Sequence, residues 1–248
     1  MKRLLEKLLV SALAFVLSLT LLAAEQERPV AGADWKVPEI GMEFVWIKAM
    51  ECWVGKYEVT NGEYRKFKPD HDSKSYEKQS LNGDRQPVVF VSYDDITGYA
   101  QWLTAREQKA GRLPDGYCYR LPSRDEWTTF CQCGDGRLYP WGNSLPPTYG
   151  NYSGREADGG EWARIGGYKD DFPVSCPVEK SGMNKWGLYG VGGNAWECTV
   201  KSEPELSFDA WRGASWGNNL PVSLQSRCRF VCFDPSRYCG FRLILSRG

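Results

Sequence analysis

The chain has 248 residues, which is enough for one domain with a sizeable core. Its 31 lysines and arginines balance its 31 aspartates and glutamates, so charge gives no case for binding nucleic acid or a membrane surface. The single histidine, His71, excludes three-histidine zinc sites, two-histidine iron sites and HExxH metal sites. It lies in a charged, turn-rich stretch, so we expect it to be a solvated loop residue.

The N-terminus has the pattern of a secretory signal. Two basic residues precede an apolar run at 8–22, which ends in two alanines before a polar stretch. The run is short for a membrane span, and no second run of this kind follows. The alternative is an N-terminal anchor or core helix. We predict a signal peptide at 1–24, an N-terminal extension at 25–40 and one domain at 41–248, without a membrane span once the signal is removed.

Capping signals predict three helices. Thr60 can cap a short helix, and either Ser92 or Asp94 begins a longer one that ends near residue 111. Ser123 and Glu126 form the capping-box pattern of a third helix. Strand-like runs occupy 42–47, 53–59, 197–200, 210–216 and 241–245, whereas glycine, proline and asparagine dominate 139–188. We therefore predict an α+β fold that is largely irregular, with few helices and a small antiparallel sheet.

Two kinds of side chain carry expectations about the interior. Glu126 and Glu197 each neighbour a tryptophan and are expected to be buried, with an arginine partner supplied by Arg120, Arg212 or Arg242. The nine cysteines are an odd number without a regular framework, and none forms a CxxC motif. We expect at most one or two disulfides and several free or buried thiols.

Seven segments of the chain stand out as motifs and cover almost the whole domain. They are YEVTNGEYRKF (57–67), PVVFVSYDDITGYAQWL (87–103), YRLPSRDEW (119–127), YPWGN (139–143), GLYGVGGNAWEC (187–198), RGASW (212–216) and GFRL (240–243). Together and in this order they resemble the formylglycine-generating (sulfatase-modifying) enzyme family. The resemblance implies a C-type-lectin-like fold, which agrees with the α+β class predicted independently.

The same resemblance implies two calcium sites. Oxygen ligands from a long irregular segment suit this hard cation. In the second set Gly190 replaces an asparagine of the family and removes one side-chain oxygen, so the alternative for its glutamate is a buried pair with arginine. The first set falls on Asn151, Tyr152, Asp170 and Phe172, and the second on Gly193, Ala195 and Glu197.

The family's enzymes oxidise a substrate cysteine with two cysteines of their own, which hold copper just after the RGASW-like motif. In this chain the matching positions are Asn218 and Ser223. Because Cu(I) is held by soft sulfur ligands, we expect no copper and no catalysis. The alternative is an oxidase whose cysteines are displaced to Cys228 and Cys232.

Residues 217–239 have an unusual composition, without glutamate, lysine, methionine or tryptophan and without helix or strand periodicity. The segment resembles the part of variable proteins, such as the treponemal one, that diversity-generating retroelements rewrite at adenines. We predict an exported monomer, in the periplasm or on the cell surface, that binds a protein or cell-surface ligand through 216–239. Its alternatives are an ordinary divergent loop and an envelope scaffold domain. The predicted contact residues are Trp216, Asn218, Asn219, Ser223, Ser226, Cys228, Phe230, Cys232, Phe233, Ser236, Arg237 and Tyr238.

Overall fold

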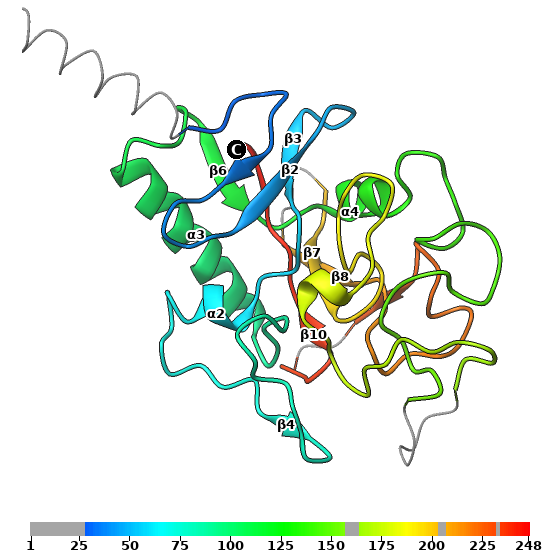
Figure 1. Cartoon of the computed structure of the whole chain (residues 1–248). Helices are drawn as coiled ribbons and strands as arrows, with labels where there is room; N and C mark the ends of the chain where they lie inside the picture. The colour runs from blue at the N-terminus through cyan, green and yellow to red at the C-terminus, as the bar shows by residue number, and fades with distance from the viewer. Residues whose placement is uncertain (1–27, 157–163, 203–206, 232–233) are drawn as a thin grey trace, which may run out of the picture.

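The computed structural model describes residues 28–156, 164–202, 207–231 and 234–248 (Figure 1). The predicted signal peptide at 1–24 lies outside the described residues, and so do two predicted contact residues, Cys232 and Phe233. Within the described ranges, no helix combines the length and the apolar character that a bilayer crossing requires.

The three predicted helices form, and each begins with a capping box. The caps are Thr60, Ser92 and Ser123, whose hydroxyls accept from the backbone N–H three residues later. The acidic side chain at that third position accepts in return from the cap's own N–H, so two backbone donors are satisfied at each start. The helices are α2 (Asn61–Tyr64), α3 (Tyr93–Lys109) and α4 (Arg124–Cys131).

A five-stranded antiparallel sheet carries the two ends of the domain. Its order is β1-β2-β3-β11-β6, so the last strand of the chain lies between β3 and β6. The strands are β1 (Trp35–Lys36), β2 (Glu43–Ile47), β3 (Cys52–Gly55), β6 (Tyr117–Arg120) and β11 (Ile244–Arg247).

Three predicted strands differ from the structure, and β1 and β6 of this sheet were not predicted. The run at 53–59 ends as a strand at Gly55, where a Cβ would lie only 3.0 Å from the carbonyl oxygen of Leu243. Of the run at 241–245, only residues 244–245 form a strand, at the start of β11. Residues 239–240, just before the run, join the other sheet.

The second sheet has four strands in the order β10-β7-β8-β9 and holds residues 216–239 at both ends. β8 precedes this segment, β9 lies inside it and β10 closes it by pairing in parallel with β7. The strand predicted at 210–216 instead ends at Arg212 and begins earlier. The bounds are β7 (Trp196–Val200), β8 (Phe208–Arg212), β9 (Arg229–Phe230) and β10 (Cys239–Gly240), beside a separate hairpin of β4 (Ser75–Tyr76) and β5 (Gln79–Ser80).

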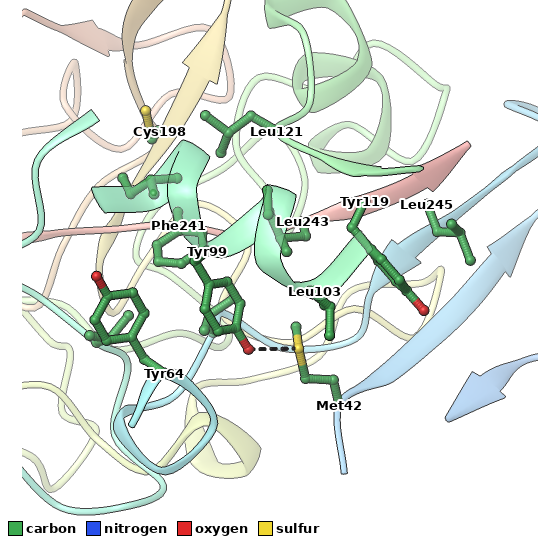
Figure 2. Packing of buried hydrophobic residues seen from close by; sticks show 14 of the residues in the cluster. Met42, Tyr64, Tyr99, Leu103, Tyr119, Leu121, Cys198, Phe241, Leu243 and Leu245 are labelled. Carbon is green, nitrogen blue, oxygen red and sulfur yellow. Dashed lines mark hydrogen bonds between the residues drawn. The ribbon is translucent and has the colours of Figure 1, made fainter. Parts of the chain in front are cut away.

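The main core includes buried residues of α3 and of the C-terminal stretch 239–245. Figure 2 shows Tyr99 from α3 against Phe241, with ring centroids 5.7 Å apart. The Tyr99 hydroxyl meets the Met42 sulfur at 3.2 Å, and Leu243 and Leu245 are fully buried nearby. Because these C-terminal residues are buried so deeply, they anchor the C-terminal end of the segment that precedes them.

His71 lies in a loop, as predicted, but it is half-buried and hydrogen-bonded instead of fully solvated. Its Nε2 lies 3.0 Å from the Val89 carbonyl oxygen and 3.2 Å from the Ser73 hydroxyl. Its ring packs edge-on against Tyr64. Burial lowers the pKa of the imidazole, because the protonated, charged form is poorly hydrated at this position.

The segment 139–188 is irregular as predicted, and the regular element described within it is the single 3-10 turn η1 (Val178–Lys180). No disulfide joins two of the eight cysteines in the described ranges. Most of them are buried, in line with the expectation of several buried thiols.

Candidate functional site

A tight turn follows β8 and presents the segment 216–239. Gly213 has a φ of +84°, and a Cβ there would lie 2.8 Å from the Cα of Gly192, so only glycine fits. The turn is then held by Asn218, whose Oδ1 accepts from both the N–H and the hydroxyl of Ser215 at 2.9 Å. The Asn218 carbonyl oxygen also accepts from the Ser153 N–H at 3.0 Å. Asn218 therefore shapes this turn.

The thiols described near the segment are not at this turn. Ser223 is half-buried, and its N–H donates to the carbonyl oxygen of Leu220 at 2.8 Å. Cys228 is half-buried near Arg212, and burial raises the pKa of its thiol. Cys239 is fully buried on β10 among core residues. The Ser215 hydroxyl accordingly contacts the amide of Asn218, at a position where the resemblance implies a cysteine in the family's enzymes.

Exposed apolar side chains gather in the segment 216–239. Four of the eight large hydrophobic residues exposed in the described ranges belong to it, namely Leu220, Val222, Phe230 and Val231, with exposed fractions of 47–62%. Only Phe230 was among the predicted contacts. The signal that was available for the others is their apolar character in a stretch without periodicity.

Two predicted contact residues are buried instead of lying at the surface of the segment. Trp216 is 4% exposed, and Ser226 is fully buried. Tyr238 is half-buried, with its ring 4.9 Å from that of Trp216. Arg237 lies over the ring of Tyr76 at 4.5 Å. The remaining described contacts, Asn219 and Ser236, are half-buried.

In the first predicted calcium set, Asp170 contacts Tyr152 and Phe172, and Asn151 supplies a buried oxygen without a hydrogen-bond partner. The amide nitrogen of Asn151 donates to the Val174 carbonyl and to Asn194 Oδ1, both at 2.9 Å, while its Oδ1 is buried without a hydrogen-bond partner. Asp170 accepts from the Tyr152 N–H at 2.7 Å and from the Phe172 N–H at 3.0 Å. Burial raises the pKa of Asp170 to about 7. These oxygens fit a hard cation.

In the second predicted set, Glu197 pairs with an arginine, which is the alternative given for this glutamate in place of calcium. The carboxylate of Glu197 is fully buried and accepts from Arg242 Nη2 at 2.7 Å, from Arg242 Nε and from Trp127 Nε1 at 2.7 Å. A side chain at Gly190 would overlap the carboxylate of Glu58. Both expected glutamate–arginine pairs thus form, since Glu126 also pairs with Arg120 at 2.7 Å.

Known proteins are similar to this chain in sequence. A family model described as the sulfatase-modifying factor enzyme 1-like domain matches residues 31–247. The formylglycine-generating enzyme of Bos taurus is 30% identical over 172 residues, which are 69% of this chain and 32% of that protein. The inactive C-alpha-formylglycine-generating enzyme 2 of Mus musculus is 33% identical over 172 residues, 65% of this chain and 50% of the relative. The chain therefore spans about a third to a half of these relatives.

Solved structures agree in fold. PvdO from Pseudomonas aeruginosa superposes with a TM-score of 0.61 at 20% identity, over 88% of this chain and 99% of that one. Treponema denticola variable protein 1 superposes with a TM-score of 0.58 at 15% identity, over 79% and 84%. These likenesses confirm the predicted α+β, C-type-lectin-like fold of the formylglycine-generating-enzyme type.

Proposed function

Because the chain belongs to the sulfatase-modifying factor enzyme 1-like family, we propose a function from what it keeps and what it replaces. It keeps the scaffold and replaces the paired thiols by an amide and a hydroxyl. We infer that it is an exported protein that binds a protein or cell-surface ligand through residues 216–239. The family includes relatives named as enzymes and relatives named as inactive, so membership agrees with either outcome.

The observation that carries the proposal is the exposure of apolar side chains on a fixed segment. Leu220, Val222, Phe230 and Val231 are about half exposed, while β8 and β10 hold the chain on both sides. Exposed apolar groups on a soluble domain mark interaction surfaces when they cluster. A preorganised backbone lowers the ordering cost of binding, so substitutions at such positions change affinity more than fold.

Partner capture tests this binding role. The change is Val222→Ser with Phe230→Ser, and the matched control is Val30→Ser with Met183→Ser, which removes two apolar groups of similar exposure elsewhere. We expect the first pair to lose binding to the cell surfaces or proteins that capture the parent chain, and the control pair to retain it. Equal binding by both pairs, with unchanged unfolding midpoints, would contradict a binding role for 216–239.

The segment's composition supports a finer version, in which a diversity-generating retroelement rewrites it. This version requires a near-copy of the 3′ end of the gene that differs at adenines, beside a reverse transcriptase gene. Sequencing the neighbouring DNA tests it directly. If neither element is present, the segment is an ordinary divergent loop, and the binding role then rests on the capture experiment alone.

The second function to test is oxidation of a substrate cysteine by displaced thiols. The relatives named as formylglycine-generating enzymes favour it, as does the partial exposure of Cys228. The purified chain is incubated with copper and a CxPxR peptide, and aldehyde is measured by mass spectrometry. We expect none. Aldehyde that is lost in Cys228→Ser would overturn the binding proposal in favour of an enzyme.

A third role is a scaffold domain in an envelope complex. It predicts a constant partner that contacts a face away from residues 216–239. Cross-linking followed by mapping of the contact residues distinguishes it, because the proposed function requires contacts at Leu220, Val222 or Phe230.

We also propose calcium at the first set. Asn151 and Asp170 would supply side-chain oxygens, and Tyr152 and Phe172 backbone carbonyls. The unsatisfied Asn151 oxygen and the half-buried Asp170 carboxyl, whose pKa is raised, support this. The cation would balance that carboxylate and order the irregular segment 139–188, which packs against the turn that Asn218 forms.

A further inference from the structure

A second feature borders the segment 216–239 at Arg227. A cavity of about 400 Å³ lies between the outer face of α4 and the β8 end of the second sheet. Three of its seven lining residues are arginines, one from the helix, one from β8 and one from the segment. The lining residues are Arg124, Asp125, Thr128, Thr129, Gln132, Arg212 and Arg227.

Arg212 forms the buried wall of this cavity and is incompletely satisfied. It is 4% exposed, and its Nη2 donates to Asp209 at 3.1 Å. Its Nη1 donates to the Arg227 carbonyl oxygen at 3.4 Å, which ties the segment to β8. Its Nε is buried and has no hydrogen-bond partner. A buried donor without an acceptor destabilises the site by the desolvation of that group, so an acceptor arriving from outside is favoured.

The charged side chains around the cavity carry an excess of positive charge. Arg124 pairs with Asp125 at 3.3 Å, and Arg212 pairs with Asp209. Arg227 is exposed and has no ion pair within the described ranges. Arg229 lies directly across from Arg212 in the β8–β9 pair and adds a further positive charge. This excess of positive charge favours an anion at the cavity.

The neutral lining residues are already engaged. The hydroxyls of Thr128 and Thr129 donate to the carbonyl oxygens four residues earlier, at 2.8 Å each. The amide nitrogen of Gln132 donates to the Arg137 carbonyl oxygen at 2.9 Å. The free donors at the cavity are accordingly guanidinium N–H groups, whose planar fork matches a carboxylate.

We infer that this cavity binds a carboxylate group of the partner that the segment 216–239 recognises. The inference deepens the proposed function and rests on it for the identity of the occupant, since Arg227 belongs to that segment. Together the two features define an acidic residue and apolar side chains as the recognised chemistry. Exposed apolar side chains supply contact area, and the cavity fixes orientation.

NMR of the ¹⁵N-labelled chain tests the cavity without the natural partner. The probes are acetate and a blocked tri-glutamate peptide, followed through the Nε–H signals of the arginines. We expect saturable shifts of the Arg212 and Arg227 signals. Arg227→Gln should weaken peptide binding about fivefold, the upper range for an exposed ion pair. Arg247→Gln is the matched control, because this exposed arginine lies on β11 and does not line the cavity, and it should leave binding unchanged.

Inorganic phosphate and sulfate form the comparison arm. The absence of saturable shifts, equal weakening by Arg247→Gln, or tighter binding of phosphate than of carboxylate would each overturn the inference. If peptide binding is found but the Val222→Ser, Phe230→Ser pair captures partners normally, the cavity stands and the proposed binding face fails. If partner capture depends on that pair but the peptide does not bind, the reverse holds.

Discussion

Replacing Glu197 with alanine is expected to destabilise the fold strongly, because it leaves a buried charge without its partner. Arg242 and Glu197 are both fully buried, and Arg242 Nη2 lies 2.7 Å from the carboxylate. Breaking a buried ion pair from one side costs about 3–5 kcal/mol. This is a large part of the total stability of a typical domain, about 5–15 kcal/mol.

The structure indicates why the cost lies in this range. The guanidinium keeps two other acceptors, the carbonyl oxygens of Gly55 at 2.7 Å and Tyr189 at 2.6 Å, so its hydrogen bonds are only partly lost. Its charge, however, loses its balancing carboxylate. The indole N–H of Trp127 also loses its acceptor, which adds about 1–3 kcal/mol for an unsatisfied buried donor.

Urea unfolding of the parent and variant chains measures this loss. Asp84→Ala is the control, since Asp84 pairs with Arg65 but is 81% exposed and should cost less than about 1 kcal/mol. The double variant Glu197→Leu, Arg242→Met should be more stable than Glu197→Ala, because it removes both charges. A loss below about 1 kcal/mol for Glu197→Ala would refute the reasoning. A loss that appears only when calcium is present would instead make Glu197 a metal ligand.

Three further predictions follow from the sites described. Calcium at a hundredfold excess over its Kd should raise the free energy of unfolding of the parent chain by about 2.7 kcal/mol. Thermal scans should show the resulting rise in the unfolding midpoint in Asp171→Asn but not in Asp170→Asn. Asp171 is exposed beside the proposed ligand, so equal shifts in both variants would exclude the site. The imidazole of His71 should titrate below its ordinary pKa of 6.5 by NMR, where it gives the only histidine signal. Because the unfolded chain then binds the proton more readily, this group's contribution to stability should fall as pH drops below 6.5, and a midpoint above 6.5 would contradict the burial. Ser123→Ala should cost about 1 kcal/mol in urea unfolding, and an unchanged midpoint would show that α4 does not need its cap.

The local signals in the sequence determined the helix starts and the chemistry of the family's thiol positions. Thr60, Ser92 and Ser123 act within four residues of themselves, because a capping hydroxyl reaches only the first turn of its helix. The replacement of sulfur at Asn218 and Ser223 is likewise legible without coordinates, because residue type alone decides whether a soft metal can be held.

Tertiary structure decided which distant groups meet. The sequence offered three arginines for Glu197, and only the return of the chain between the two sheets selected Arg242, which lies 45 positions away. The same return left only residues 244–245 of the run at 241–245 in a strand, β11, and it buried Trp216, which the sequence had suggested as a contact residue. Pairing and burial depend on contacts between remote residues, for which a single sequence carries no local signal.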